Sequence, residues 1–395
     1  MPLTDVNADV NEVIELAREL VKIPSVYMQE AEISNFIYAR LDEWGLSPRR
    51  VPVENHGPCI VAESGAEGAP SVVLNGHMDT VEVMAGWEHD PFGAEIEDGR
   101  LFGLGSLDMK SGLAAMMIAF RNLFDSECTK RRRLVFQAVP GEELDGSGTR
   151  TLIKEGSFEG AEAVIVGEGF GGLGAVTNGR RGGAYYDFEV MGQSAHGAMP
   201  HLGKNAVVDA SKIICALEES ELAVSETLKS DAYELLRETQ TILQISGGGD
   251  SLSVPERCRV RFVRCTIPGG RTDLQTELES MVADLSLVCV VKIEFKGEPG
   301  NLYLPYLTNP SEPLVKAAVA SLDEHVGSEP VLVCGVSEAD DNLIAQELGL
   351  PVICVGPGES GETARYHQPE ESIETSQLAT AVEVYTSIVR RLCGI

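Results

Sequence analysis

Six side chains that could carry chemistry lie beyond the carboxyl ends of short apolar runs in this 395-residue sequence. After runs at 72–74, 134–136, 164–166 and 352–355 come His77, Asp79, Glu142, Glu143, Glu168 and His367. In an open α/β sheet the ligand crevice lies at the carboxyl ends of the strands, so these side chains are expected to line one crevice. A further candidate, Asp108, stands in the glycine-rich segment 103–112. Taken alone, it also fits the N-cap of the helical run that follows.

A cluster of two imidazoles and four carboxylates would be electrostatically costly without a cation, because neighbouring carboxylates resist joint ionisation. Imidazole together with carboxylate suits zinc, and a bridging carboxylate invites a second ion at about 3.5–4 Å. The His77-x-Asp79 spacing is typical of a carboxylate that orients a metal-bound imidazole. The Glu142-Glu143 pair can divide its roles between binding metal and holding a proton. Each pattern alone also fits a core histidine, a fixed turn or a solvated acidic pair.

The elements that must position these residues are predicted from hydrophobic periodicity. Residues 8–23 have one apolar face and end before Pro24, which predicts an amphipathic helix. The short apolar runs alternate with helical patterns at 109–124, 148–155, 313–324 and 342–347, which predicts an α/β layered domain.

Residues 184–295 have a different pattern, in the order strand, helix, strand, strand, helix, strand. This order predicts a small α+β (ferredoxin-like) unit inserted into the larger domain. Glycine- and proline-rich segments at 179–183 and 297–305 are its expected edges. The predicted division is therefore 1–183 and 298–395 for the larger domain, and 184–297 for the inserted one.

The composition excludes some classes of partner. With 31 basic and 61 acidic residues the net charge is −30, and such a surface repels phosphate backbones and anionic lipid. We therefore expect neither nucleic acid nor a membrane as a partner. The chain has no apolar run of membrane-spanning length and a polar, acidic start, which favours a cytoplasmic protein. Nine scattered cysteines without a Cys-x-x-Cys pair are expected to be reduced.

Six segments occur in the order found in a known family. They are Gly76–Val81, Gly105–Gly112, Pro140–Glu143, Gly167–Glu168, Ser194–Pro200 and Tyr366–Glu371. Over nearly its whole length the sequence resembles the zinc-dependent amidohydrolases that include acetylornithine deacetylase, succinyl-diaminopimelate desuccinylase, aminoacylase and bacterial glutamate carboxypeptidase. The resemblance implies a mixed-sheet zinc-peptidase catalytic domain with an inserted lid or dimerisation domain.

At the matching positions the resemblance implies two zinc ions per chain, with cobalt or manganese as possible substitutes. Asp108 would bridge the two ions. His77 and Glu168 would complete one site, and Glu143 and His367 would complete the other.

The resemblance also implies three catalytic residues. Glu142 would be the general base, and Asp79 would orient the metal-bound imidazole of His77. His196 of the inserted domain would reach into the partner subunit's site to polarise the scissile carbonyl. A homodimer follows from that last role. The implied reaction is hydrolysis of a small-molecule amide, an N-acyl amino acid of the deacetylase or desuccinylase type. The alternatives are a dipeptidase or carboxypeptidase of the same family, or a catalytically idle relative that binds an amino-acid derivative.

Two departures from the family pattern concern the substrate pocket. Leu252 stands where many relatives have Asn, and Cys265 stands where they have the Arg that helps to hold a substrate carboxylate. The neighbouring Arg264 is not an easy substitute, because adjacent strand residues face opposite sides. Other candidates to bind an anionic group are Arg180, Arg181 and Arg271. Glu338 also departs from the pattern, since relatives commonly have Asp there.

Overall fold

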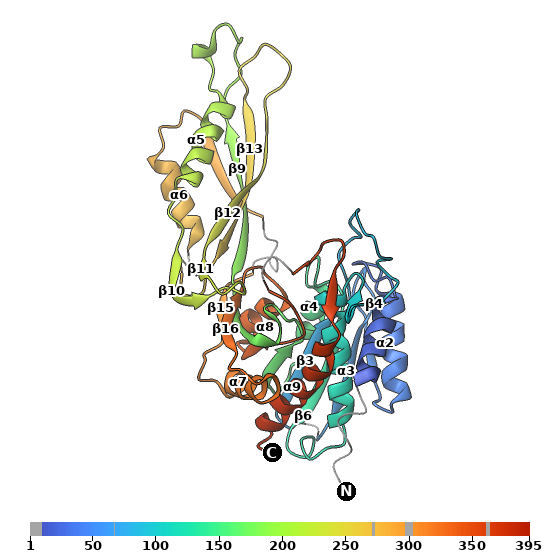
Figure 1. Cartoon of the computed structure of the whole chain (residues 1–395). Coiled ribbons are helices and arrows are strands. Elements are labelled where there is room, and N and C mark those ends of the chain that lie inside the picture. The colour runs from blue at the N-terminus through green and yellow to red at the C-terminus, as the bar shows by residue number, and fades with distance from the viewer. Residues whose placement is uncertain (1–9, 67, 271–272, 297–302, 361–363) are drawn as a thin grey trace.

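The computed structural model describes residues 10–66, 68–270, 273–296, 303–360 and 364–395, and it has two lobes (Figure 1). The lower lobe contains a large mixed sheet between two layers of helices. The upper lobe contains a smaller sheet, β12-β13-β9-β14, with α5 and α6 beside it. The predicted α/β class is confirmed.

Within the described residues, the large sheet has nine strands in the order β1-β2-β6-β3-β7-β17-β8-β15, with β16 paired to β8. The strands are β1 (Arg49–Val51), β2 (Cys59–Ser64), β3 (Ser71–His77), β6 (Arg133–Val139), β7 (Ala161–Val166), β8 (Ala175–Arg180), β15 (Tyr306–Leu307), β16 (Val331–Gly335) and β17 (Val352–Cys354). β3 is parallel to β6 and β7, and β17 is parallel to β7. Their carboxyl ends therefore meet at one edge of the sheet, as predicted.

Both faces of this sheet are covered by helices, so β3 is buried along its whole length. Val72 and Leu74 belong to one apolar core and the intervening Val73 to the other, as the two-residue period of a strand requires. The first core packs against α1 (Val10–Val21), α2 (Ala31–Glu43), α3 (Ser111–Leu123), α7 (Pro313–Val326) and α9 (Ser376–Leu392). The second packs against α4 (Ser147–Glu155) and α8 (Asp340–Leu348).

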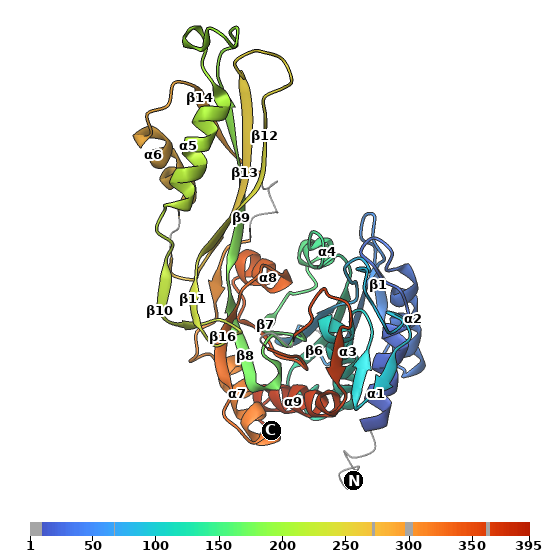
Figure 2. The ribbon, with the colours of Figure 1, turned by 45° about the horizontal axis from the view of Figure 1, so that its top comes forward.

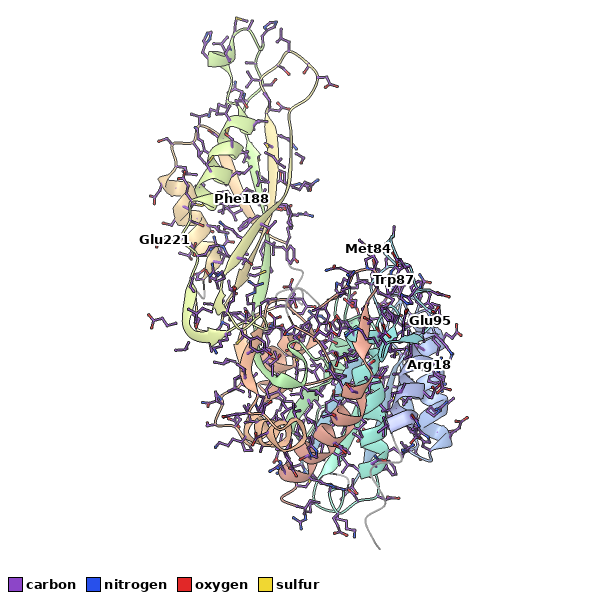
Figure 3. The ribbon with its side chains drawn as sticks, in the orientation of Figure 1. Arg18, Met84, Trp87, Glu95, Phe188 and Glu221 are labelled. Atoms are coloured by element: carbon purple, nitrogen blue, oxygen red, sulfur yellow. The ribbon has the colours of Figure 1, made fainter. Side chains whose placement is uncertain are left out.

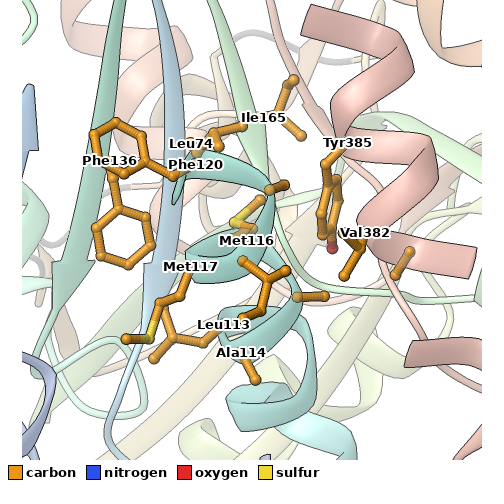
Figure 4. Close-up of a cluster of buried hydrophobic side chains, with 14 of the residues drawn as sticks. Leu74, Leu113, Ala114, Met116, Met117, Phe120, Phe136, Ile165, Val382 and Tyr385 are labelled. Atoms are coloured by element: carbon orange, nitrogen blue, oxygen red, sulfur yellow. The ribbon is translucent and has the colours of Figure 1, made fainter. Parts of the chain in front are cut away.

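Helix α3 is the centre of the first core (Figure 4). It is buried at nearly every position, and it places Met116 and Phe120 between sheet residues such as Phe136 and the ring of Tyr385 on α9. The helix begins at Ser111, two residues later than predicted, because residues 106–110 form an irregular turn around Asp108. A small sheet of β4 (Glu95–Glu97), β5 (Arg100–Phe102) and β18 (Ser372–Glu374) borders that turn.

The upper lobe has the predicted order of elements. They are β9 (Gly182–Met191), α5 (Ala206–Glu218), β12 (Thr239–Gly247), β13 (Arg257–Thr266), α6 (Leu274–Asp284) and β14 (Val290–Phe295). All neighbouring strands are antiparallel, and their order is that of a ferredoxin-like sheet. Phe188 lies in its core, while Met84 and Trp87 lie at the top of the lower lobe (Figure 3). The exact domain boundaries remain a prediction, and residue 297 is outside the described residues.

A hairpin that the sequence did not predict links the two lobes. β10 (Val224–Lys229) and β11 (Leu235–Arg237) leave the upper lobe and run beside β16 (Figure 2). Ser230 forms a bridge with Cys334 of β16, and the Tyr233 hydroxyl donates to the Gly171 carbonyl at 3.2 Å. Helices α2 and α9 were not predicted either.

The cysteines and the helices agree with two features of the composition. All nine cysteines are free thiols, and most are buried. Among the described residues, no helix combines the length and apolar character that crossing a membrane requires.

Gly112 provides a test of how tightly α3 packs beneath the strand ends. A Cβ at Gly112 would lie 2.1 Å from the Gly167 carbonyl oxygen, which is backbone and cannot swing aside. We therefore expect Gly112→Ala to lower the free energy of unfolding by about 1–3 kcal/mol in urea titrations, although alanine is favoured in an open helix. Ser111→Ala is the matched control, because the buried Ser111 hydroxyl has no hydrogen-bond partner in the described part of the chain. Equal stabilities for wild type and Gly112→Ala would contradict this packing.

Candidate metal centre

The predicted crevice forms at the carboxyl edge of the large sheet. His77 ends β3, Glu142 and Glu143 lie in the turn after β6, and Glu168 follows β7. His367 comes from a loop farther beyond β17, in a left-handed backbone conformation with φ of 57°. The structure thus brings together residues from four separate segments, together with Asp108 from the turn before α3.

Two groups of side chains have the spacing of metal ligands. Ligand atoms of His77, Asp108 and Glu143 lie within 4.8 Å of one another, and so do those of His77, Glu142 and Glu168. These groups divide the residues differently from the sets implied by the family resemblance.

Asp108 lies between the two imidazoles and presents a different oxygen to each. Its Oδ1 is 3.1 Å from His77 Nε2, and its Oδ2 is 3.5 Å from His367 Nε2. On the outer sides, His77 Nε2 is 3.9 Å from Glu168 Oε1, and His367 Nε2 is 3.0 Å from Glu143 Oε2. This is the arrangement expected of a carboxylate that bridges two cations.

The carboxylates of the centre raise the pKa values of its two imidazoles. Hydrogen bonds to Asp108 and Glu143 raise the pKa of His367 to about 10. Burial alone would lower the pKa of His77, but its hydrogen bond to Asp108 raises that pKa well above the usual value. Burial also opposes ionisation of Asp108, yet hydrogen bonds from both imidazoles keep its pKa low.

The other carboxyl groups are harder to ionise. Burial raises the pKa of Asp79 and of Glu168 to about 7, and burial followed by the charge of Glu168 raises that of Glu142 well above its usual value. A divalent cation would take the place of the shared protons, because metal ligation requires neutral imidazole and ionised carboxylate. The donor set of imidazole nitrogens and carboxylate oxygens therefore fits a divalent metal such as zinc.

Asp79 contacts both the turn that carries Glu142 and Glu143 and the imidazole of His77. Its Oδ2 accepts from the Glu143 amide at 3.0 Å and its Oδ1 from the Glu142 amide at 3.3 Å. The His77 Nδ1 is 3.1 Å from the Asp79 carbonyl oxygen. With Nδ1 held by this carbonyl, Nε2 is left toward the centre.

Behind Glu168 lies a buried ion network that the sequence did not predict. Arg180 has no exposed surface, and its guanidinium is 2.9 Å from Glu168 Oε2 and 2.7 Å from Asp341 Oδ1. The Tyr306 hydroxyl donates to Asp341 at 2.5 Å. Arg180 was a candidate for binding a substrate anion, but it is fully engaged by these carboxylates.

Glu371 also supports the centre, and this role was not predicted from the sequence. Its buried carboxylate accepts from the amides of Leu107 at 2.8 Å and Asp108 at 3.1 Å, so it fixes the turn that presents Asp108. Glu371 stands in the Tyr366–Glu371 segment, and that segment was the signal that could have found it.

His196 is not part of this cluster within one chain. It lies in the segment between β9 and α5, at the far end of the upper lobe (Figure 1). Its exposed ring accepts from the Ala198 amide at 3.1 Å, and in the described residues no contact joins it to the metal centre.

The remaining residues considered for the substrate pocket are a leucine and three arginines. Leu252 is 73% exposed, and Arg264 is buried on the helix-covered face of β13, where it donates to Gln240 at 2.8 Å. Arg181 donates to the Arg237 carbonyl at 3.1 Å and to the Val336 carbonyl. Arg271 lies outside the described residues.

The fold and the site together define a metal-dependent hydrolase of two lobes. Residues 73–391 match the model of peptidase family M20/M25/M40, and the chain belongs to this family. It is 25% identical to a probable succinyl-diaminopimelate desuccinylase of Staphylococcus epidermidis over 95% of this chain and 96% of that protein.

Solved structures share the fold. An M20 family metallo-carboxypeptidase from Sulfolobus solfataricus superposes with a TM-score of 0.75 at 18% identity, covering 97% of this chain and 100% of that one. A dinuclear metal-binding M20 peptidase from Bacillus subtilis superposes with a TM-score of 0.72 at 14% identity, covering 98% and 99%.

The buried network behind Glu168 can be tested by removing its cation. We expect Arg180→Met to lower stability by about 3–5 kcal/mol, because Glu168 and Asp341 would keep buried charges without a partner, and to weaken metal binding about 10–100-fold. Urea unfolding and metal titration measure these effects. The control is the neighbouring, more exposed Arg181→Met, which leaves both carboxylates paired. If the two variants bound metal equally well, Arg180 would have no part in holding Glu168.

Proposed function

We propose that this chain is a dinuclear zinc enzyme that hydrolyses the amide bond of an N-acyl amino acid, of the deacetylase or desuccinylase type. The observation that carries the proposal is that the Glu142 carboxyl group lies among the candidate metal ligands without a hydrogen-bond partner in the described residues. Its carboxylate lies within 4.8 Å of ligand atoms of His77 and Glu168, yet among the described residues it has no hydrogen-bond partner. A carboxyl group held in a metal centre without a structural partner is suited to accept and release a proton.

In the proposed centre Asp108 would be shared by two ions, with His77 and Glu168 holding one and Glu143 and His367 holding the other. The two carboxylate oxygens of Asp108, each near a different imidazole, support this assignment. When bound, the ions polarise the amide carbonyl and lower the pKa of water to near 7. Cobalt or manganese would serve in place of zinc, since the donor set suits these ions as well.

Glu142 is the proposed general base. It takes the proton of the attacking water and then gives it to the leaving amine, which requires a carboxyl group that titrates near neutrality. Burial next to Glu168 raises the pKa of Glu142, which favours the second of these steps. Asp79 keeps the Glu142 backbone in place by accepting its amide hydrogen.

The substrate would enter a pocket of about 460 Å³ that Glu142 and Glu143 share with Tyr185, Lys296 and Glu338. The desuccinylase relative, which matches over nearly its whole length, favours an N-acyl amino acid. The second candidate is a dipeptidase or carboxypeptidase, favoured by the name of the superposed Sulfolobus solfataricus protein. A catalytically idle relative is the remaining alternative, although every proposed ligand and Glu142 are present.

We also propose that the active form is a cytoplasmic homodimer. The segment between β9 and α5, which carries His196, lies at the far end of the upper lobe (Figure 1), so His196 would reach a metal centre only in a partner subunit, where it would polarise the scissile carbonyl. The acidic net charge of −30 supports a small molecule, not nucleic acid or a membrane, as the partner.

Replacing Glu142 by Gln tests the base directly. We expect Glu142→Gln to keep about two zinc ions per chain but to lower kcat by about three or more orders of magnitude. Metal content by mass spectrometry and hydrolysis of N-succinyl, N-acetyl and dipeptide substrates are the measurements. Retention of most activity would exclude Glu142 as the base. Faster turnover of dipeptides than of N-acyl amino acids by the wild type would select the peptidase alternative.

Mixing two inactive variants tests the shared site. Glu142→Gln and His196→Ala subunits, refolded together in equal amounts, should recover about a quarter of wild-type activity, because half of the dimers would be mixed and each would have one complete site. Neither variant alone should recover activity. If the mixture stayed inactive while dimers formed, His196 would not act across the subunits.

A further inference from the structure

A buried histidine–glutamate pair lies directly beneath the turn that carries Glu142. Glu30 immediately precedes α2, and His56 lies between β1 and β2. His56 Nδ1 is 2.9 Å from Glu30 Oε1, and their side chains are 2% and 0% exposed. Neither residue belongs to the proposed metal centre or to the proposed chemistry.

Glu30 is held as a fixed hydrogen-bond acceptor. Its carboxylate also accepts from the amides of Met28 at 2.7 Å and Gly57 at 3.0 Å. Three donors thus surround one buried carboxylate, which makes His56 Nδ1 the hydrogen donor of the pair. The orientation of the imidazole ring is thereby set by a rigid acceptor.

The Nδ1–Cε1–Nε2 edge of the same ring also lies against Gly141, the residue before Glu142. A Cβ at Gly141 would lie 2.9 Å from His56 Cε1 and 3.2 Å from Nδ1, so the ring occupies the space of a side chain. Gly141 also has a φ of 78°, a left-handed conformation that favours glycine. With the His56 ring in place, position 141 therefore has no room for a side chain.

The backbone of Gly141 fixes the shape of the turn formed by Gly141–Gly146. Its carbonyl oxygen accepts from the amides of Asp145 at 3.0 Å and Gly146 at 2.8 Å, with a longer contact to Leu144 at 3.4 Å. His56 Nε2 additionally approaches Asp145 Oδ1 at 3.8 Å. The turn is thus held by Asp79 on the side of the centre and by His56 from beneath.

We propose that His56, oriented by Glu30, is a positioning residue that fixes the Gly141–Gly146 turn and thereby aims Glu142 at the reacting water. This inference rests on the proposed function, because it assigns a consequence to the placement of the general base. His56 touches neither substrate nor metal and acts only through Gly141. A displacement of Glu142 by about 1 Å is enough to cost about 100-fold in rate.

The test compares His56→Leu with His56→Asn in the full-length, metal-loaded enzyme. Leu fills a similar volume but cannot donate to Glu30, whereas the Asn amide nitrogen can take the place of Nδ1. We expect His56→Leu to lower kcat by about 10–100-fold with KM changed less than about threefold. His56→Asn should recover part of that loss. Both variants should bind as much zinc as the wild type.

Hydrogen exchange provides a measurement that does not depend on activity. The amides of Asp145 and Gly146, which bond to the Gly141 carbonyl, should exchange faster in His56→Leu. The matched control is His325→Leu, which breaks a histidine–glutamate pair between α7 and α9, where His325 Nδ1 is 3.3 Å from Glu383 Oε2. It should leave both kcat and the exchange of these amides unchanged.

Three results would overturn the inference. They are a folded, metal-loaded His56→Leu with wild-type kcat, a loss of activity caused by loss of zinc, and unchanged exchange in the turn. If the wild type itself hydrolysed no amide, the proposed function would fail by that result alone. The exchange measurement would then still decide whether His56 holds the turn.

Discussion

The gathering of five buried or half-buried carboxyl groups at one edge of a sheet is the constraint on which the rest of this structure depends. Asp79, Asp108, Glu142, Glu143 and Glu168 repel one another, and each buried charge needs compensation. The chain supplies it in three ways. Two imidazoles lie between carboxylates, backbone amides donate to Asp79, and a buried arginine pairs with Glu168. Among the described residues, the Glu142 carboxyl group alone is left without a hydrogen bond, and this is the basis of the role that we propose for it.

The supports of the centre come from distant parts of the chain. Glu371 fixes the turn of Asp108 from the segment that also supplies His367, so one segment serves two sides of the centre. His56 and Glu30 support the Glu142 turn from the first fifth of the sequence. Glu371 and His56 both act on the backbone of the turns that carry Asp108 and Glu142.

Much of this arrangement could be predicted from sequence, for physical reasons. Strands that end together bring His77, Glu143 and Glu168 to one edge, and short apolar runs identify those strands. The small inserted sheet follows from its order of elements. The hairpin β10–β11 was missed because most of its residues are exposed and lack an apolar alternation.

The residues that support the centre could not be predicted in this way. Arg180 and Asp341 are far apart in the sequence, as are His56 and Gly141, and no local pattern marks such pairs. His196 has the opposite problem, because its motif is distinctive but one chain alone does not bring it to the centre. Contacts between distant segments, and contacts between subunits, require the folded arrangement itself.

Strands β8 and β9 are separated by a single residue, Arg181, and they run from the lower lobe into the middle of the upper sheet (Figure 2). The last residue of β8 is Arg180, which forms an ion pair with Glu168. The same short segment therefore joins the two lobes and supplies the cation beside Glu168. The connection between the lobes and the charge balance of the candidate metal centre depend on adjacent residues of one strand pair.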